Sequence, residues 1–158
     1  MLTGALASSY YGHPRTTLDI DVIVTARPDD LATLARALVK VNLKAEEKRL
    51  ERAWRSKYRI ATLEDRKSPH TLDIIFTDVR LERKPGSILG LPTFYQSADS
   101  LILAKLKMIK VTLQPERAAI DREDIKAILK SSRLRLKSIR KKAKVQGTSE
   151  ILEDLIRK

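Results

Sequence analysis

Cysteine is absent from this chain of 158 residues, so no disulfide or thiolate metal site can hold the fold, and any metal must bind to oxygen or histidine. No apolar run reaches the roughly 20 residues needed to cross a bilayer, and no basic segment leads into an apolar one at the N-terminus. Aromatic residues are few, one Trp, four Tyr and two Phe, so a core can absorb most of them. These absences predict a soluble, cytoplasmic protein without a membrane partner.

Positive charge exceeds negative charge, with 32 Lys and Arg against 20 Asp and Glu and a net charge of +12. The excess is uneven, because residues 131–144 hold seven bases and no acid, whereas residues 1–30 hold four acids and two bases. A one-sided basic surface favours a polyanionic partner such as nucleic acid. A solvated Lys/Arg surface, as in a heat-adapted protein, explains the same composition.

The hydrophobic pattern predicts one domain of the α/β (α+β) class, in which strands come first and helices follow. We expect a twisted, mixed β-sheet flanked by helices in 1–96, and a helical C-terminal part in 97–158 packed on the same domain. The expected strands are 18–25, buried on both faces, the hairpin 57–64 and 71–77, and a short edge strand in 86–95. The expected helices are 28–41, 98–113, 120–129 and 149–156, while 42–55 fits either helix or loop.

Two aspartates, Asp19 and Asp21, interrupt the apolar stretch "LDIDVIV" (18–24). Side chains alternate faces along a strand, so both carboxylates project the same way, with their Cα atoms roughly 6.5 to 7 Å apart. Like charges within a sheet are costly unless a cation neutralises them. Because Mg²⁺ prefers carboxylate and phosphate oxygens, the pair predicts a magnesium site.

Asp73 repeats this pattern in "LDIIF" (72–76). If the two strands are neighbours, Asp73 completes a cluster able to hold two metals about 3.5 to 4 Å apart, the arrangement that serves phosphoryl transfer. Upstream, Gly4 and Ala5 precede a predicted short helix. A glycine at such a turn lets the backbone approach a phosphate.

Together these residues resemble the polymerase-beta-like nucleotidyltransferase superfamily. Gly4-Ala5, a spacer of 13 residues, Asp19-Ile20-Asp21 and the later Asp73 match the family's order of motifs. The string "GALASSYYGHPRTTLDIDVIV" is most similar to the small AbiEii-type members, which belong to abortive-infection and toxin–antitoxin systems. "ADSLILAKLKM" and "IDREDIKAIL" are similar to two later helices of that group.

The resemblance implies a nucleotidyltransferase fold and an enzyme that uses two Mg²⁺, or Mn²⁺, held by the catalytic residues Asp19, Asp21 and Asp73. It implies transfer of a nucleoside monophosphate from a nucleoside triphosphate such as ATP to a hydroxyl of RNA, tRNA or a partner protein, with release of pyrophosphate. The nucleotide-binding residues that it implies are Gly4, Ala5, Arg15, Thr17 and Lys105. Arg15 would contact phosphate, and Thr17 would support the aspartate pair. An oligomer is compatible with this arrangement.

Two alternatives stay open. Lys105 either reaches the triphosphate or snorkels from an apolar helix. The whole chain is either an enzyme or a catalytically inactive module of the same fold that binds nucleic acid or a partner protein. Ala5, where the family usually has Gly or Ser, and the short stretch ahead of Gly4 favour the module.

Several polar residues are expected to be structural. Asp121 and Asp124 share a helix face, where capping and solvent contact are their expected roles. His13 and His70 have no partner at metal-ligand spacing and are expected in turns.

Overall fold

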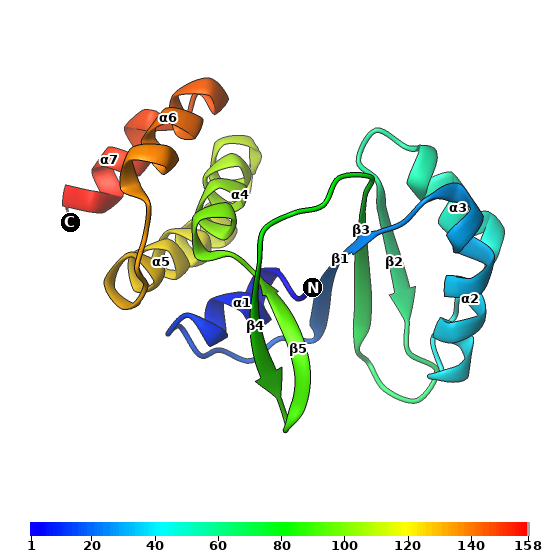
Figure 1. The fold of residues 1–158 in the computed structure, drawn as a ribbon. Coiled ribbons are helices and arrows are strands. Elements are labelled where there is room, and N and C mark those ends of the chain that lie inside the picture. Colours follow the sequence, from blue (N-terminus) through cyan, green and yellow to red (C-terminus); the bar gives the residue numbers. More distant parts are fainter. Residues whose placement is uncertain (158) are drawn as a thin grey trace.

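A computed structural model describes residues 1–157, and Lys158, the last residue of the expected C-terminal part, lies outside the described residues. The helices are α1 (Gly4–Tyr10), the 3₁₀ turn η1 (Pro28–Asp30), α2 (Leu31–Lys40), α3 (Glu47–Arg55), α4 (Ala98–Val111), α5 (Pro115–Ser131), α6 (Leu136–Gln146) and α7 (Ser149–Arg157). The strands are β1 (Asp19–Thr25), β2 (Ile60–Glu64), β3 (Thr71–Thr77), β4 (Arg83–Ile88) and β5 (Leu91–Gln96). The described chain is an α+β fold with a helical C-terminal part, as predicted (Figure 1).

The central sheet has three strands in the order β1-β3-β2. β3 runs parallel to β1 and antiparallel to β2, so the sheet is mixed and the predicted hairpin of the second and third strands is confirmed. The register of β1 and β3 pairs Asp19 with Thr71 and Asp21 with Asp73. Residues paired in this way project to the same face, so the acids of both strands share one face of the sheet.

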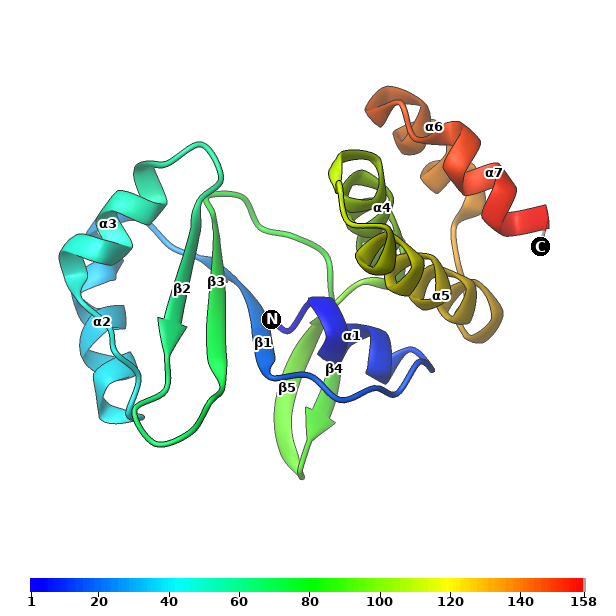
Figure 2. The ribbon, with the colours of Figure 1, turned by 180° about the vertical axis from the view of Figure 1, so that it is seen from behind.

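Residues 1–3 connect this sheet to the separate hairpin of β4 and β5. The Thr3 N–H donates to the carbonyl of Asp21 at 3.0 Å, and the Leu2 N–H donates to the carbonyl of Phe94 at 2.7 Å. Figure 2 shows the N-terminus lying between β1 and the hairpin. The first residues of the chain therefore hold the sheet and the hairpin next to each other.

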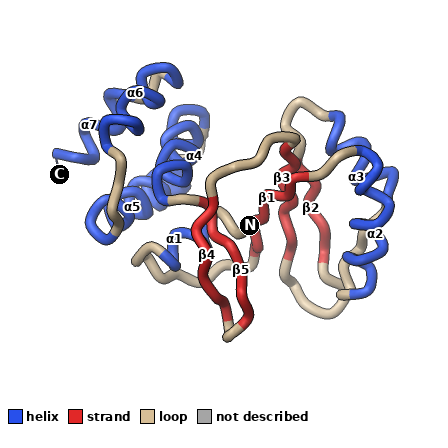
Figure 3. The backbone as a smooth tube through the Cα atoms, in the orientation of Figure 1, coloured by secondary structure: helices blue, strands red, loops and turns tan. Residues whose placement is uncertain are grey.

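Helices α2 and α3 lie beside the three-stranded sheet, away from the C-terminal helices, as the blue and red segments of Figure 3 show. They pack on the face opposite the aspartates, where the fully buried side chains are Leu31, Leu50, Leu63 and Ile74. Because these helices cover one face only, β1 is not buried on both faces: Asp19 and Ile20 are exposed, and 21–24 are half-buried. The prediction of a doubly buried strand is wrong.

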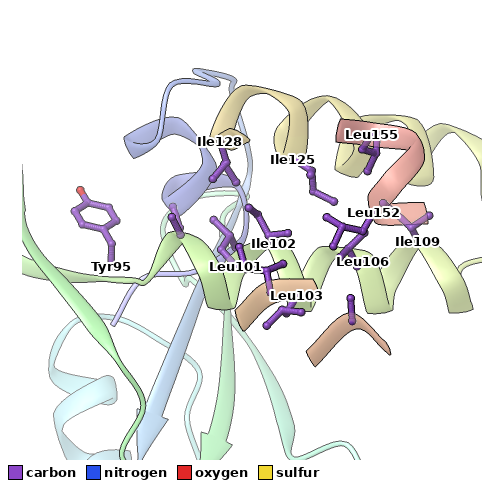
Figure 4. Close-up of a cluster of buried hydrophobic side chains, with 14 residues drawn as sticks. Tyr95, Leu101, Ile102, Leu103, Leu106, Ile109, Ile125, Ile128, Leu152 and Leu155 are labelled. Carbon is purple, nitrogen blue, oxygen red and sulfur yellow. The ribbon is translucent and has the colours of Figure 1, made fainter. Parts of the chain in front are cut away.

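The C-terminal helices enclose a second hydrophobic cluster (Figure 4). Its fully buried side chains come from α4, α5, α6 and α7, and they include Leu101, Ile102, Leu106, Ile125, Ile128, Ile139 and Leu152. Ala7 of α1 and Tyr95 of β5 belong to the same cluster. Elements of the first 96 residues therefore complete the core of the helical part.

Residues 86–95 form parts of two strands, β4 and β5, with a two-residue turn between them, so the prediction of one edge strand is wrong. Leu89 and Gly90 have φ angles of 50° and 79°, and positive values at both central residues are typical of a type I′ hairpin loop. The flanking residues become β4 and β5. In residues 42–55, for which the sequence allowed either helix or loop, the chain forms α3 from Glu47 to Arg55.

The predicted helices are present with shifted ends. The helix expected at 28–41 begins with η1 and continues as α2, and the helix expected at 120–129 starts earlier, at Pro115. Ser97 caps α4, where its hydroxyl accepts from the Ser100 N–H at 3.4 Å. Within residues 1–157, no helix combines the length and the apolar character that a bilayer span requires.

Candidate functional site

The carboxylates of Asp21 and Asp73 stand side by side on neighbouring parallel strands, with Asp19 on the same face. Burial raises the pKa of the Asp21 carboxyl, and the negative charges of Asp73 and Asp19 raise it further. The positive charges of Arg117 and Lys105 act in the opposite direction without restoring the ordinary value. The structure thus brings the three predicted aspartates together on one face.

These aspartates do not surround a common point as they stand. Asp19 is exposed, and the Thr71 hydroxyl donates to its Oδ1 at 2.6 Å. The Oδ1 atom of Asp73 has no exposed surface and no hydrogen-bond partner in the described chain. Within residues 1–157, no group of three or more His, Cys, Asp or Glu side chains is arranged so that it could hold a metal ion.

Gly4 begins α1 directly against Asp21. Its φ is +57°, and a Cβ at this position would lie 2.0 Å from Oδ2 of Asp21. A side chain at Gly4 would therefore displace the carboxylate, in addition to straining the backbone. Ala5 follows as a buried residue of α1. The helix that the sequence associates with phosphate binding thus starts at the aspartate face.

Thr17 lies two residues before β1 and binds the backbone of its first residue, Asp19. Its hydroxyl accepts from the Asp19 N–H at 3.2 Å and donates to the Asp19 carbonyl at 3.0 Å. These bonds fix the backbone at Asp19.

Lys105 lies in a buried ion cluster. Its Nζ is 2.7 Å from Oδ1 of Asp121 and 2.6 Å from Oδ2 of Asp124, and the residue is only 5% exposed. The snorkelling interpretation is therefore wrong. The solvent role expected of Asp121 and Asp124 is also wrong, because both are buried. Asp121 shares a helix face with the core residues Ile125 and Ile128, four and seven positions later, and Asp124 lies four positions before Ile128.

The loop after α1 joins this cluster. His13 Nδ1 contacts Oδ1 of Asp124, and Arg15 Nε lies 3.6 Å from the same oxygen. His13 lies outside the helices and strands, as expected, but it also has a specific partner, Asp124. Arg15, expected at phosphate, instead has its Nε buried beside Asp124 without a hydrogen bond in the described chain.

The cluster keeps Asp124 ionised. Burial alone would raise the pKa of the Asp124 carboxyl, but hydrogen bonds from Lys105 and His13, together with the charges of Lys105 and Arg15, lower that pKa overall. Asp124 therefore links α4, α5 and the loop that leads into β1.

Arg117 on α5 is a site residue that the sequence reasoning missed. It is exposed, has no ion-pair partner among the described residues, and contributes the first of the two positive charges that act on Asp21. Its setting, "PERAAI" (115–120), carries no motif. Only the packing of α5 brings it within electrostatic range of the sheet.

The donor set suits a hard divalent cation. Asp21 and Asp73 offer carboxylate oxygens, the ligands that Mg²⁺ prefers. A cation there would give Asp73 Oδ1 the partner it lacks and would offset the repulsion that raises the pKa of Asp21. Asp19 can contribute once its carboxylate leaves the Thr71 hydroxyl.

No protein-family model matches this chain, and comparison with curated proteins gives no match.

Asp21→Asn should stabilise the metal-free protein, because the substitution removes a charge from a repulsive cluster. A raised folded-state pKa means that Asp21 lowers stability above its folded pKa, and that this cost vanishes as the pH falls below the ordinary value of about 3.9. We expect the variant to gain a few degrees in Tm at pH 7 with EDTA, and the gain to shrink on acidification. The control is Asp29→Asn, at an exposed acid, which should leave Tm unchanged. A lower Tm for Asp21→Asn at pH 7 would contradict the repulsive cluster.

Asp124→Asn should have the opposite effect, because it leaves Lys105 with an incomplete set of buried partners. Removing one member of a buried ion pair costs roughly 3 to 5 kcal/mol in the free energy of unfolding. Since the pKa of Asp124 is lowered by folding, this contribution is present above about pH 3.9 and is lost as the pH falls through the folded value. Urea denaturation at pH 7 measures it. Glu123→Gln, which breaks an exposed pair with Lys126, should cost about 1 kcal/mol or less. Equal costs for the two variants would contradict the buried cluster.

Proposed function

We propose that this chain is a magnesium-dependent nucleotidyltransferase with the polymerase-beta-like fold. It would move a nucleoside monophosphate from a nucleoside triphosphate to a hydroxyl of RNA or of a partner protein. The observation that carries the proposal is the register of β1 and β3, which sets Asp21 beside Asp73 on one face. Gly4 meets Asp21 from α1, in keeping with the motif Asp19-Ile20-Asp21 and its upstream glycine. A role in a toxin–antitoxin system stays a prediction.

The three aspartates are the residues that would hold Mg²⁺ or Mn²⁺. When bound, such cations neutralise the triphosphate and stabilise the charge that develops on the attacking and leaving oxygens. The resemblance assigns phosphate binding to the backbone at Gly4 and Ala5, and the cation would offset the negative charge of Asp21 beside them. Such catalysis consists mostly of positioning and electrostatic stabilisation.

Asp73 is the residue we assign to proton transfer. Its carboxylate lies beside Asp21 on the aspartate face, and the carboxylate oxygen that does not hold the cation would accept the proton of the acceptor hydroxyl. The acceptor oxygen forms a bond to the α-phosphorus while the bond from that phosphorus to the oxygen bridging to the β-phosphate breaks. Pyrophosphate leaves with the electron pair of the broken bond, and the proton passes from Asp73 to solvent.

The cations of the helical part have different roles in this proposal. Lys105 and Arg15 are engaged by Asp124, so they position the helices and act on the site through their field. Arg117 is exposed and free of ion pairs in the described chain, so we assign the direct contact with the triphosphate to it.

Incubation with Mg²⁺, each labelled nucleoside triphosphate, and tRNA or no added acceptor tests the proposal. The wild-type protein should transfer label, and Asp73→Asn should lower the rate by about a thousandfold, because it removes both a ligand and a proton acceptor. Arg117→Gln should lower kcat/KM roughly 10- to 100-fold through the loss of a charged hydrogen bond, with Tm unchanged. Asp29→Asn and Arg55→Gln, at exposed positions away from the aspartate face, are the matched controls.

Transfer that survives Asp73→Asn would remove the basis of the mechanism. Salt-sensitive RNA binding without transfer from any of the triphosphates would favour the catalytically inactive module instead.

A further inference from the structure

A groove of about 740 Å³ lies at the end of α1 remote from Gly4. Four segments that are distant in sequence line it: the end of α1, the start of β4, the start of α4 and the connection from α5 to α6. Figure 1 shows these segments converging beside the hairpin. The groove is separate from the aspartates, which face the opposite end of α1.

The free charges of this groove are positive. Arg83, Lys84 and Arg133 line it, all three are exposed, and none has an ion-pair partner among the described residues. Successive residues of a strand project to opposite faces, and Lys84 shares a face with Tyr95, which stacks on Tyr10 of the groove. The guanidinium of Arg83 lies over the ring of Phe94 on the other face of the hairpin, 3.7 Å from the centroid. Lys84 and Arg133 are therefore the cations that face the groove from two segments without a counterion from the protein.

The two acids of the groove share one guanidinium, so these three groups keep one net negative charge, which the unpaired cations outnumber. Arg135 Nε lies 2.6 Å from Oδ2 of Asp99, and the rest of its guanidinium contacts Glu82. Hydrogen bonds and the charge of Arg135 lower the pKa of Glu82, and the charge of Lys142 on α6 adds to this. This network also fastens the α5–α6 connection to the start of β4. The wall that carries Arg133 is therefore held in place relative to the wall that carries Arg83 and Lys84.

The groove is within reach of the proposed site. Helix α1 has seven residues, so its two ends are about 10 Å apart at 1.5 Å per residue. Gly4 at one end meets Asp21, and Tyr10 at the other end lines the groove. A flexible strand that occupies the groove could extend its end along α1 to the aspartates within a few nucleotides.

We propose that this groove binds the phosphate backbone of a single-stranded RNA that serves as the acceptor. The inference rests on the proposed function for the position of the reacting 3′ end, but the binding itself does not. Regularly spaced phosphates suit unpaired cations on both walls, and such contacts track a backbone without reading sequence. The basic run at 131–144, which begins at this groove, extends the positive surface along α6.

Fluorescence anisotropy of a labelled single-stranded RNA of about 12 nucleotides, in EDTA so that no transfer occurs, tests the groove. The double variant Lys84→Gln, Arg133→Gln should weaken binding at least about fivefold at 0.1 M salt. It should also reduce the slope of log K against log salt concentration by about 1.4, since each of the two phosphate contacts on a single strand contributes about 0.7. Lys84→Arg with Arg133→Lys keeps the charges and should retain most of the affinity.

The control is a double variant with the same net charge, Lys40→Gln, Lys48→Gln, at exposed positions on α2 and α3. It should change affinity less than twofold. Equal losses for the two double variants would mean general electrostatic attraction and would overturn the proposal, as would wild-type protein that does not bind RNA. Tighter binding of single-stranded DNA, or of an acidic peptide, than of RNA would also overturn it.

The outcome for the groove can be separated from that for the site. Asp21→Asn should bind RNA as tightly as the wild type, because it lies at the other end of α1. RNA binding that depends on the groove, without any transfer activity, would retain the groove and reject the proposed enzyme. Transfer to protein alone, with RNA binding unaffected by the groove variant, would reject the groove and retain the enzyme.

Discussion

Repulsion between the carboxylates of Asp21 and Asp73 is the constraint on which the site depends. The parallel register of β1 and β3 forces the two side chains onto one face, and burial strengthens their mutual effect. Gly4 adds to this constraint, because only a residue without a side chain leaves space for the Asp21 carboxylate. In the proposed function, a cation completes this arrangement and offsets the repulsion.

The placement of the helical part follows from a second charge balance. Lys105 is surrounded by Asp121 and Asp124, and Asp124 in turn holds His13 and Arg15 from the loop that leads into β1. A buried cluster of this kind contributes little net stability but fixes geometry, because breaking any contact leaves a charge without a partner. Through it, α4 and α5 are set against the aspartate face, and α5 presents Arg117 near Asp21.

The sequence allowed the mixed sheet, the main helices and the shared face of Asp19 and Asp21 to be predicted, since these follow from the periodicity of single segments. The position of Asp73 beside Asp21 depends on the pairing of β1 with β3. The only sign of that pairing in the sequence is that Asp73, like Asp19 and Asp21, stands among apolar residues. The burial of Asp124 was predictable, because it lies four positions before the core residue Ile128 on the same helix, but its acidic side chain favoured a solvent role. Arg117 carries no local signal, and the turn at Leu89 depends on a φ that leucine rarely adopts.

The central claim is that Asp21 and Asp73 are tolerated side by side because they share a divalent cation. Anomalous diffraction from a crystal soaked with Mn²⁺ and a non-hydrolysable nucleoside triphosphate tests this claim most directly. The account predicts a Mn²⁺ peak at ligating distance from a carboxylate oxygen of each residue, with the triphosphate on the same ion. A well-ordered nucleotide without such a peak, or an Asp73 carboxylate turned away from Asp21, would contradict it.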